Sequence, residues 1–366
     1  MRVAIITDWE CPSGIYSFSK SLIEQLNSRI ETTIVGVRCP HFLDPIYYSR
    51  DNFSLNNLIQ FLSVINQTRS AKKQSDIVHL QEPMWTFSSL IYLQISLVKK
   101  AKVVTTVHEV YQDNEKKNWL LKVYRTFCEK MITTCSDAII VHNPDLVKYF
   151  HEKGAKSVFF IPHGAPSNPI LLDKDESKRK LGLEGKKVIT IFGFINPRKD
   201  YDMILQVLPE LDNDVVLLIA GGLFEPCSKE QKICYERLIH EENTTERVKV
   251  TGYLDEADIA TAICASDIML FPYRHEVQSG ALNLALAYKI PSIASDLPYF
   301  REIKKKYDCI EIAENAGEFL EKIRTLLTVQ SCVDRLITNS QKYWQNNNLE
   351  SLTDKYIHVY NTVLER

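Results

Sequence analysis

Two segments of the chain combine residue types that suit a negatively charged ligand. In the first, Gly193–Lys199, the cations Arg198 and Lys199 follow a β-branched run within a few residues. An arginine beside a lysine suits a diphosphate, because the guanidinium binds as a fork and the ammonium as a point charge. A solvated turn is the alternative that these residues leave open.

The second segment is the start of a predicted helix. Gln278 and Ser279 precede Gly280, and Ala281–Ala287 is apolar except for Asn283. Ser279 suits an N-cap, and Gly280 would let a ligand approach the backbone amides at the positive end of the helix dipole. We therefore predict a phosphate site, with an ordinary capped core helix as the alternative.

Other polar residues offer weaker signals. His108 and His163 each follow an apolar run, and a histidine there can polarise a group or move a proton near neutral pH, although most such histidines are structural. The loop that ends in Ser13 and Gly14 lacks the G-x-G-x-x-G of nicotinamide sites. Asp212-Asn213-Asp214 precedes a strand and so lies at its amino end, where we expect a turn and no metal.

The elements that would position these residues alternate along the chain. Strands are predicted in the first half at Arg2–Thr7, Thr32–Val37, Ile77–Leu80, Val103–His108 and Ala138–Val141, and in the second at Lys187–Phe192, Val215–Ala220, Val248–Thr251, Ile268–Phe271 and Ser292–Ala294. Amphipathic runs such as Ile15–Leu26 separate them. This order predicts an α/β fold with two doubly wound parallel sheets, and such sheets bind ligands at the carboxyl ends of their strands.

The domain boundary is predicted at a proline-rich linker. Residues 162–169 contain three prolines and one glycine, and a charged run follows. We expect an N-terminal domain over residues 1–168, a C-terminal domain over 169–345, and a terminal helix at about 346–366 that crosses back to the first domain.

Composition narrows the class of protein. The net charge of -2 gives no general attraction to nucleic acid, and the nine cysteines are scattered, without a C-x-x-C pair. The start MRVAIITDWE is typical of a strand rather than a signal peptide, and no apolar run reaches the length of a membrane span. These features predict a cytoplasmic protein with reduced thiols and no metal cofactor.

Residues 114–134 could modify that location. Leu120, Val123, Tyr124, Phe127 and Met131 recur at helical spacing, with lysines and an arginine between them. A basic amphipathic helix can lie on an anionic membrane, here the inner face of the cytoplasmic membrane. A surface helix with a solvated charged face has the same pattern, so both interpretations remain.

Taken together, the ordered motifs resemble those of a known family. Ala265-Ser266-Asp267 through Asp296 resembles the signature of retaining glycosyltransferases of family 4, which have the GT-B fold of two Rossmann-like domains facing a cleft. Further matches are Pro12–Gly14, Val107–Glu109, Pro162–Gly164, Gly193–Lys199, Ile219–Gly222 and Thr251–Leu254. The resemblance covers nearly the whole chain.

The resemblance implies a role for each matching residue. Tyr253 and Leu254 would hold the base of a nucleotide sugar, and Arg198, Lys199, Gln278, Ser279 and Gly280 its diphosphate. Glu276 and His108 would contact the transferred sugar, and Ser13 and Gly14 would lie near the donor phosphate and the acceptor. The second carboxylate of the family's motif falls at Leu284, and we expect neighbouring Asn283 to replace it only weakly.

The resemblance implies a retaining hexosyltransferase that needs no metal. The expected partners are a UDP- or GDP-sugar and an acceptor that is a lipid-linked glycan, another glycan or a small molecule, most often in cell-surface polysaccharide assembly. Two alternatives remain open. One is an epimerase or phosphorylase on the same fold, and the other, suggested by Leu284, is a non-catalytic sugar-nucleotide-binding partner of a transferase.

Overall fold

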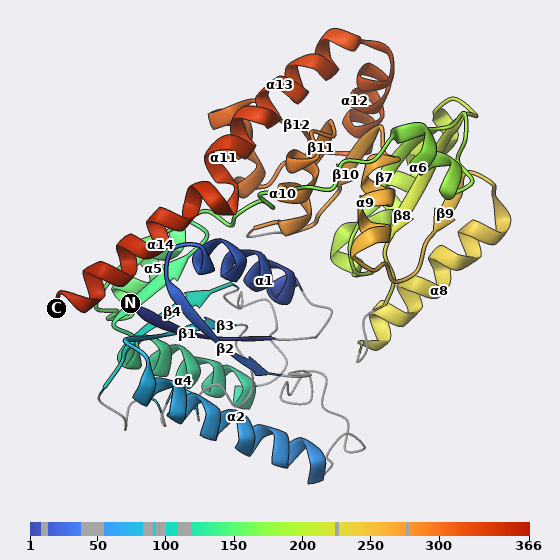
Figure 1. Ribbon diagram of the computed structural model, residues 1–366. Helices are drawn as coiled ribbons and strands as arrows, with labels where there is room; N and C mark the ends of the chain where they lie inside the picture. Colours follow the sequence, from blue (N-terminus) through green and yellow to red (C-terminus); the bar gives the residue numbers. More distant parts are fainter. Residues whose placement is uncertain are drawn as a thin grey trace. The chain divides into compact units, whose positions relative to one another are not determined.

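The computed structural model describes residues 1–8, 14–37, 55–82, 91, 92, 95, 100–108, 119–223, 227–275 and 278–366. It divides the chain into two compact units. Unit 1 contains Met1–Pro162 and Leu349–Arg366, and unit 2 contains His163–Asn348. The helices and strands of both are labelled in Figure 1.

Unit 1 is built on one parallel sheet. Its strands lie in the order β2-β1-β3-β4-β5-β6. They are β1 Arg2–Asp8, β2 Glu31–Val37, β3 Ile77–Glu82, β4 Lys102–Val107, β5 Ala138–Val141 and β6 Val158–Phe160. The expected strands are present, and β6 is an addition that was too short to show an alternating pattern.

Both faces of the first sheet are covered by helices. Ala4 and Ile6 of β1 face a core shared with α2 (Leu55–Gln74), α4 (Trp119–Cys135) and α5 (Asp145–Glu152). Val3 and Ile5 face a second core with α1 (Gly14–Asn27) and α14 (Leu349–Leu364). Because successive strand residues point to opposite faces, a run that is apolar throughout fits a sheet buried on both sides.

Unit 2 contains the second parallel sheet, in the order β12-β11-β10-β7-β8-β9. The strands are β7 Lys187–Phe192, β8 Val215–Ala220, β9 Val248–Val250, β10 Ile268–Phe271, β11 Ser292–Ser295 and β12 Glu311–Ala313. The chain moves outward from β7 through β8 to β9 and then returns to β10 on the other side of β7. The strand order therefore reverses between β7 and β10, and a reversal of this kind marks the usual ligand site of an open α/β sheet.

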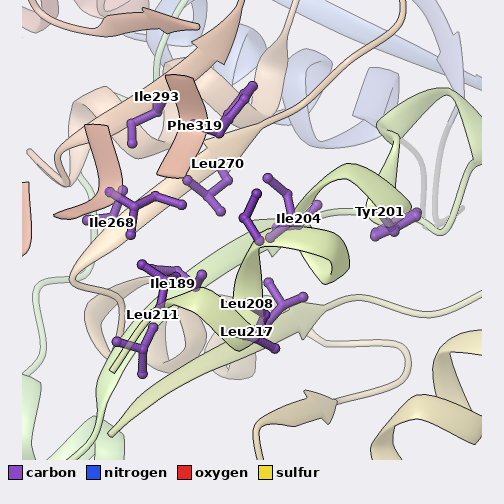
Figure 2. Close-up of a cluster of buried hydrophobic side chains, with 14 of the residues drawn as sticks. Ile189, Tyr201, Ile204, Leu208, Leu211, Leu217, Ile268, Leu270, Ile293 and Phe319 are labelled. Atoms are coloured by element: carbon purple, nitrogen blue, oxygen red, sulfur yellow. The ribbon is translucent and has the colours of Figure 1, made fainter. Parts of the chain in front are cut away.

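Helices cover both faces of this sheet as well. They are α6 Lys174–Lys180, α7 Tyr201–Val207, α8 Lys229–Thr244, α9 Glu256–Cys264, α10 Gly280–Ala287, α11 Pro298–Tyr307, α12 Ala316–Thr328 and α13 Gln330–Asn347, with short 3-10 helices η3 Pro197–Lys199 and η4 Leu208–Glu210. Figure 2 shows the largest core, in which Ile189, Leu217 and Leu270 of three strands meet Ile204 of α7 and Phe319 of α12.

The division between the units lies at 162/163 and 348/349 rather than at 168/169 and 345/346. Residues 163–168 and 346–348 pair with one another inside unit 2. Ala165 N donates to Asn347 O at 2.9 Å, and Trp344 Nε1 donates to Pro166 O at 2.8 Å. Among the described residues, no helix is both long and apolar enough to cross a membrane.

Candidate functional site

The loops that follow β7, β8 and β9 approach one another closely at the carboxyl edge of the second sheet. A Cβ on Gly221 would lie 2.3 Å from Gly193 O, and one on Gly222 would lie 2.4 Å from Tyr253 N. Neither distance is tolerable for a side chain, so glycine is required at both positions. The glycines thus allow three loops to share one small area at the end of the sheet.

Arg198 and Lys199 lie in η3, directly after β7. Asn196 caps this turn by accepting a hydrogen bond from Arg198 N at 3.0 Å. Arg274 N in turn donates to Arg198 O at 2.9 Å, which joins η3 to the segment that follows β10. The structure therefore brings the two cations to the strand reversal between β7 and β10.

The ammonium of Lys199 lies beneath the turn at Gly193. The side chain is buried, and Nζ donates to Phe192 O at 2.7 Å. Gly193 has a φ of +100°, which disfavours other residues, and a Cβ added there would lie 3.0 Å from Lys199 Nζ. A side chain at Gly193 would therefore press against the ammonium of Lys199.

The start of α10 has the expected form. Ser279 is the N-cap, and its Oγ accepts a hydrogen bond from Leu282 N at 3.2 Å. Gly280, the first residue of the helix, is exposed, so packed side chains do not cover it. Gln278 lies directly before the cap, with Oε1 buried. This end of α10 carries the positive end of the helix dipole to the same edge of the sheet.

Asn283 has a different role from the one expected. Its Nδ2 donates to His163 O at 2.8 Å and lies 3.0 Å from His163 Nδ1, while its Oδ1 accepts from Tyr343 OH at 2.6 Å. The amide is buried, and both its nitrogen and its oxygen are hydrogen-bonded within unit 2, so it does not replace a ribose-binding carboxylate. Leu284 next to it packs against the apolar core of α10 and α11.

This arrangement places His163 at the start of α10. A Cβ on Gly280 would lie 3.6 Å from Cε1 and 4.0 Å from Nε2 of His163. Since Asn283 Nδ2 can only donate, His163 Nδ1 accepts, and the proton of the neutral ring is on Nε2. No sequence pattern joins residues 120 positions apart, so this pairing was missed.

Tyr253 and Leu254 occupy different environments after β9. The ring of Tyr253 is half exposed and lies parallel to Phe194, with 6.3 Å between centroids and 19° between planes. Its partial burial raises the pKa of the phenol above its ordinary value. Leu254 packs instead against the core that contains Val188 and Leu218. Tyr253 thus offers an exposed aromatic surface here, and the partly buried ring of Phe194 lies beside it.

In unit 1, His108 directly follows β4. Its ring lies 5.2 Å from that of Phe18 in α1 and 5.1 Å from that of His142, measured between centroids. His142 Nδ1 donates to Ile161 O at 2.7 Å, and burial lowers the pKa of His142 to about 4. Gly14 begins α1, and a Cβ there would meet nothing within 4 Å. Ser13 and Glu276 lie outside the described residues.

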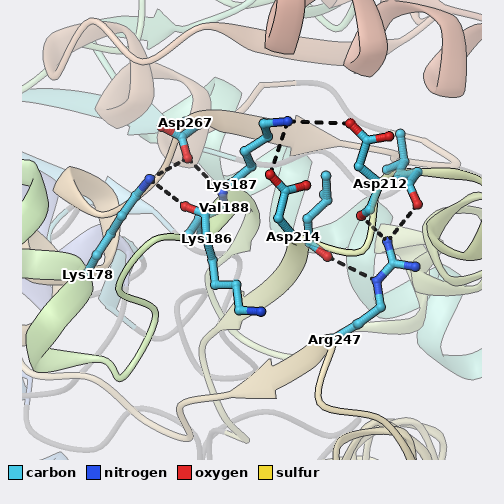
Figure 3. A network of polar contacts seen from close by, with 10 residues as sticks. Lys178, Lys186, Lys187, Val188, Asp212, Asp214, Arg247 and Asp267 are labelled. Carbon is cyan, nitrogen blue, oxygen red and sulfur yellow. Dashed lines mark hydrogen bonds and ion pairs between the residues drawn. The ribbon is translucent and has the colours of Figure 1, made fainter.

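The acidic turn at residues 212–214 lies at the opposite end of the second sheet, before β8. Lys187 Nζ contacts Asp212 at 3.4 Å and Asp214 at 3.1 Å, as Figure 3 shows. Arg247 donates to the backbone oxygen of Asp212 in this turn and to those of Leu211 and Val215 on either side of it. The prediction of a structural turn is confirmed, and no group of His, Cys, Asp and Glu in the described part of the chain could hold a metal ion.

A pocket of about 390 Å³ adjoins the site near Arg274, Asp200 and Ser295. Arg274 donates to Asp200 at 2.9 Å, so its charge is paired inside unit 2.

Comparison with known proteins gives the family of the chain. The family model of group 1 glycosyl transferases matches residues 173–343, and that of glycosyltransferase family 4 matches residues 13–168. A Klebsiella pneumoniae protein described as an uncharacterized 41.2 kDa protein in a cps region is 24% identical over 271 residues, 70% of each chain. The uncharacterized glycosyltransferase YqgM of Bacillus subtilis is 22% identical over 276 residues, 73% of this chain and 70% of its own.

Solved structures establish the fold independently. HepE of Anabaena, in complex with UDP and glucose, superposes with a TM-score of 0.75 over 99% of both chains, at 13% identity. The two family models account for most of both sheets, and the fold is GT-B. The chain therefore belongs to the group 1 glycosyltransferases, of the family 4 type.

Proposed function

We propose that this glycosyltransferase moves a hexosyl unit from a nucleotide-diphosphate sugar to an acceptor hydroxyl, with retention of the anomeric configuration. The observation that carries the proposal is the hydrogen bond from Arg274 N to Arg198 O. It ties the turn that bears the cations to the segment that opens α10, at the strand reversal of the second sheet. Two cations and a helix start at one place suit a diphosphate.

The remaining donor contacts are proposed from the resemblance to family 4. The base would lie against Tyr253 and Phe194, since stacked rings offer it a flat apolar surface. Glu276 and His108 would act on the transferred sugar, with Ser13 and Gly14 near the phosphate and the acceptor. UDP is the preferred nucleotide, supported by the complex of HepE with UDP and glucose, and GDP is second.

The chemistry depends on where charge develops. As the bond between the anomeric carbon and the phosphate oxygen loosens, negative charge grows on the leaving diphosphate and positive charge on the sugar ring. Arg198, Lys199 and the start of α10 stabilise the first charge without a metal ion. Retention would follow from attack on the same face, with the leaving phosphate accepting the proton of the acceptor hydroxyl.

We further propose an acceptor in polysaccharide or glycoconjugate assembly, reached at the inner face of the cytoplasmic membrane. The Klebsiella relative from a cps region supports the first part. Val123 and Phe127, one turn apart on α4, are 58% and 51% exposed, which supports membrane contact through 114–134.

The direct test is a product assay. The protein is incubated with UDP-, GDP- and ADP-hexoses and a panel of lipid-linked and free glycans, with and without EDTA. We expect a glycosidic product of retained configuration and release of the nucleoside diphosphate, both unaffected by EDTA. Activity that EDTA abolishes and only Mg²⁺ or Mn²⁺ restores would contradict the metal-independent mechanism.

One observation favours a second candidate function. Leu284 and Asn283 leave the α10 segment without the second carboxylate of the family's motif, and the Asn283 amide is committed elsewhere. A non-catalytic sugar-nucleotide-binding partner of a transferase would bind the donor without turnover on any acceptor. An epimerase on this fold would instead interconvert two nucleotide sugars with no acceptor present.

A further inference from the structure

A row of buried polar side chains lies on one face of the first sheet and ends at His108. His79 and Gln81 are two residues apart on β3, so both point to the same face of the sheet. Thr106 lies opposite Gln81 on the paired strand β4, and Tyr360 comes from α14 at the end of the chain. His79, Gln81, Thr106 and Tyr360 are each at most 1% exposed.

The hydrogen bonds along this row have a definite direction, which begins with Gln81. Its Oε1 lies 2.8 Å from His108 Nε2 and can only accept, so His108 donates from Nε2. Its Nε2 can only donate, and it faces His79 Nε2 at 3.4 Å. The amide therefore accepts from one histidine and donates toward the other.

His79 completes the row toward the terminal helix. Thr106 Oγ1 lies 2.7 Å from His79 Nε2, and Tyr360 OH lies 2.7 Å from His79 Nδ1. Burial, together with the nearby His142, lowers the pKa of His79 to about 3, so its ring is neutral and carries one proton. If Nε2 accepts from Gln81 and Thr106, that proton is on Nδ1 and is donated to Tyr360.

We propose that Gln81 is a positioning residue that holds His108 in the tautomer protonated on Nε2, and that α14 fixes Gln81 through Tyr360 and His79. The neutral His108 ring is then basic only at Nδ1. The catalytic part of this inference rests on the proposed role of His108 toward the transferred sugar. The tautomer itself does not depend on that role.

Phe18 and His142, the described residues whose rings contact His108, do not supply this control. Phe18 packs edge-on against the ring, and His142, whose pKa burial lowers to about 4, is the titratable group in ring contact with it among the described residues. Neither presents a carboxylate. Gln81 is therefore the side chain whose hydrogen bond to His108 the structure defines.

The tautomer can be measured without any substrate. Two-bond ¹H–¹⁵N correlation of the full-length protein, labelled at histidine, distinguishes protonation on Nε2 from protonation on Nδ1, and His108→Asn identifies the resonances. At pH 7.5 we expect the Nε2-protonated form for His108. A wild-type spectrum with the proton on Nδ1 would overturn the proposal, whatever the variants show.

Three variants test the source of the control. Gln81→Leu should allow the second tautomer, and Tyr360→Phe should have the same effect to a smaller degree. Gln81→Glu places a carboxylate at the imidazole and should raise the apparent pKa of His108 by one unit or more. Gln74→Leu on α2, which removes a similar hydrogen bond to Ser70 at the surface, should change nothing.

Activity supplies the second readout. The limb of the kcat/KM profile that reports His108 should move to higher pH in Gln81→Glu and stay in place in Gln74→Leu. A shifted tautomer with no transferase activity toward any donor would count against the proposed function and not against this inference. Gln81 variants that leave both the tautomer and the pH limb unchanged would reject it.

Discussion

A side chain at position 193 would contact Lys199 Nζ, and glycine avoids that contact. Its φ of +100° and the 3.0 Å between a hypothetical Cβ and Lys199 Nζ are two separate constraints on one residue. The chemistry of Arg198 and Lys199 predicts a diphosphate pair from sequence, with a solvated turn as the alternative. The sequence could not show that the ammonium is buried, because that depends on how the turn after β7 folds over it.

Gly193→Ala should therefore lower the affinity for the ligand more than it lowers the stability of the fold. A residue other than glycine at this φ strains the backbone by roughly 1–3 kcal/mol, and the methyl group of alanine would also lie against Lys199 Nζ. We expect the affinity for UDP, measured by calorimetry, to fall at least tenfold. Gly182→Ala is the matched control, because Gly182 also has a positive φ, +66°, yet a Cβ there meets nothing within 4 Å. Equal losses of affinity in both variants would refute the argument from this contact.

Strands and helices were the most predictable level of the structure. Lys187–Phe192, Val215–Ala220 and Ile268–Phe271 are strands at the predicted bounds, since buried parallel strands are continuous apolar runs. The strands β6 and β12 were missed, because three residues carry no periodicity. Two side-chain pairs, His163 with Asn283 in unit 2 and His108 with Gln81 in unit 1, join residues distant in sequence. A polar pair two residues apart in an apolar strand, His79 and Gln81, was the one available signal.

The contact between α6 and the second sheet predicts a pH dependence. Lys178 Nζ contacts Asp267 at 2.7 Å, and Val188 N donates to the same carboxylate at 2.7 Å (Figure 3). Burial alone would raise the pKa of Asp267, but these hydrogen bonds and the charge of Lys174 outweigh it and hold the pKa below the ordinary 3.8. Since the folded-state pKa is depressed, this stabilisation is present above pH 3.8 and is lost as the pH falls through the folded value.

Asp267→Asn should lower the free energy of unfolding by about 3 kcal/mol at pH 7, because it leaves the buried Lys178 without its counter-charge. The difference from wild type should shrink below pH 4, as urea denaturation at several pH values would show. Asp212→Asn, which loses an exposed pair with Lys187, should behave as wild type. A gap between Asp267→Asn and wild type that stays constant down to pH 3 would contradict the ion-pair account.

On the scale of the whole molecule, the last helix of the chain belongs to the first unit. Leu352, Tyr356 and Val359 of α14 pack into the core that α1 and β1 form. The resemblance to family 4 made a returning helix predictable, and the apolar spacing of Leu349–Leu364 made it helical. Nothing in the sequence alone indicated that Tyr360 would contact His79, because that contact joins residues 281 positions apart.

The exposed apolar residues of α4 predict that the whole protein binds to anionic membranes. Full-length protein should co-sediment with anionic vesicles at low salt and be released at high salt, since the attraction is partly electrostatic. Replacing Val123 and Phe127 with serine should reduce the bound fraction severalfold. Ile233→Ser on α8, which removes an apolar residue of similar exposure (55%), is the control. Equal binding by all three proteins would exclude α4 as the contact.

The central claim is that Arg198, Lys199 and the start of α10 bind a diphosphate. Calorimetric titration of UDP and UMP into wild type and into Arg198→Ala/Lys199→Ala tests it most directly. A matched control, Arg237→Ala/Lys187→Ala, removes one arginine and one lysine that lie in ion pairs elsewhere in unit 2. The wild type and the control should bind UDP at least tenfold more tightly than UMP, and the Arg198/Lys199 variant should lose that preference. A preference for UDP that survives the loss of both cations would contradict the account.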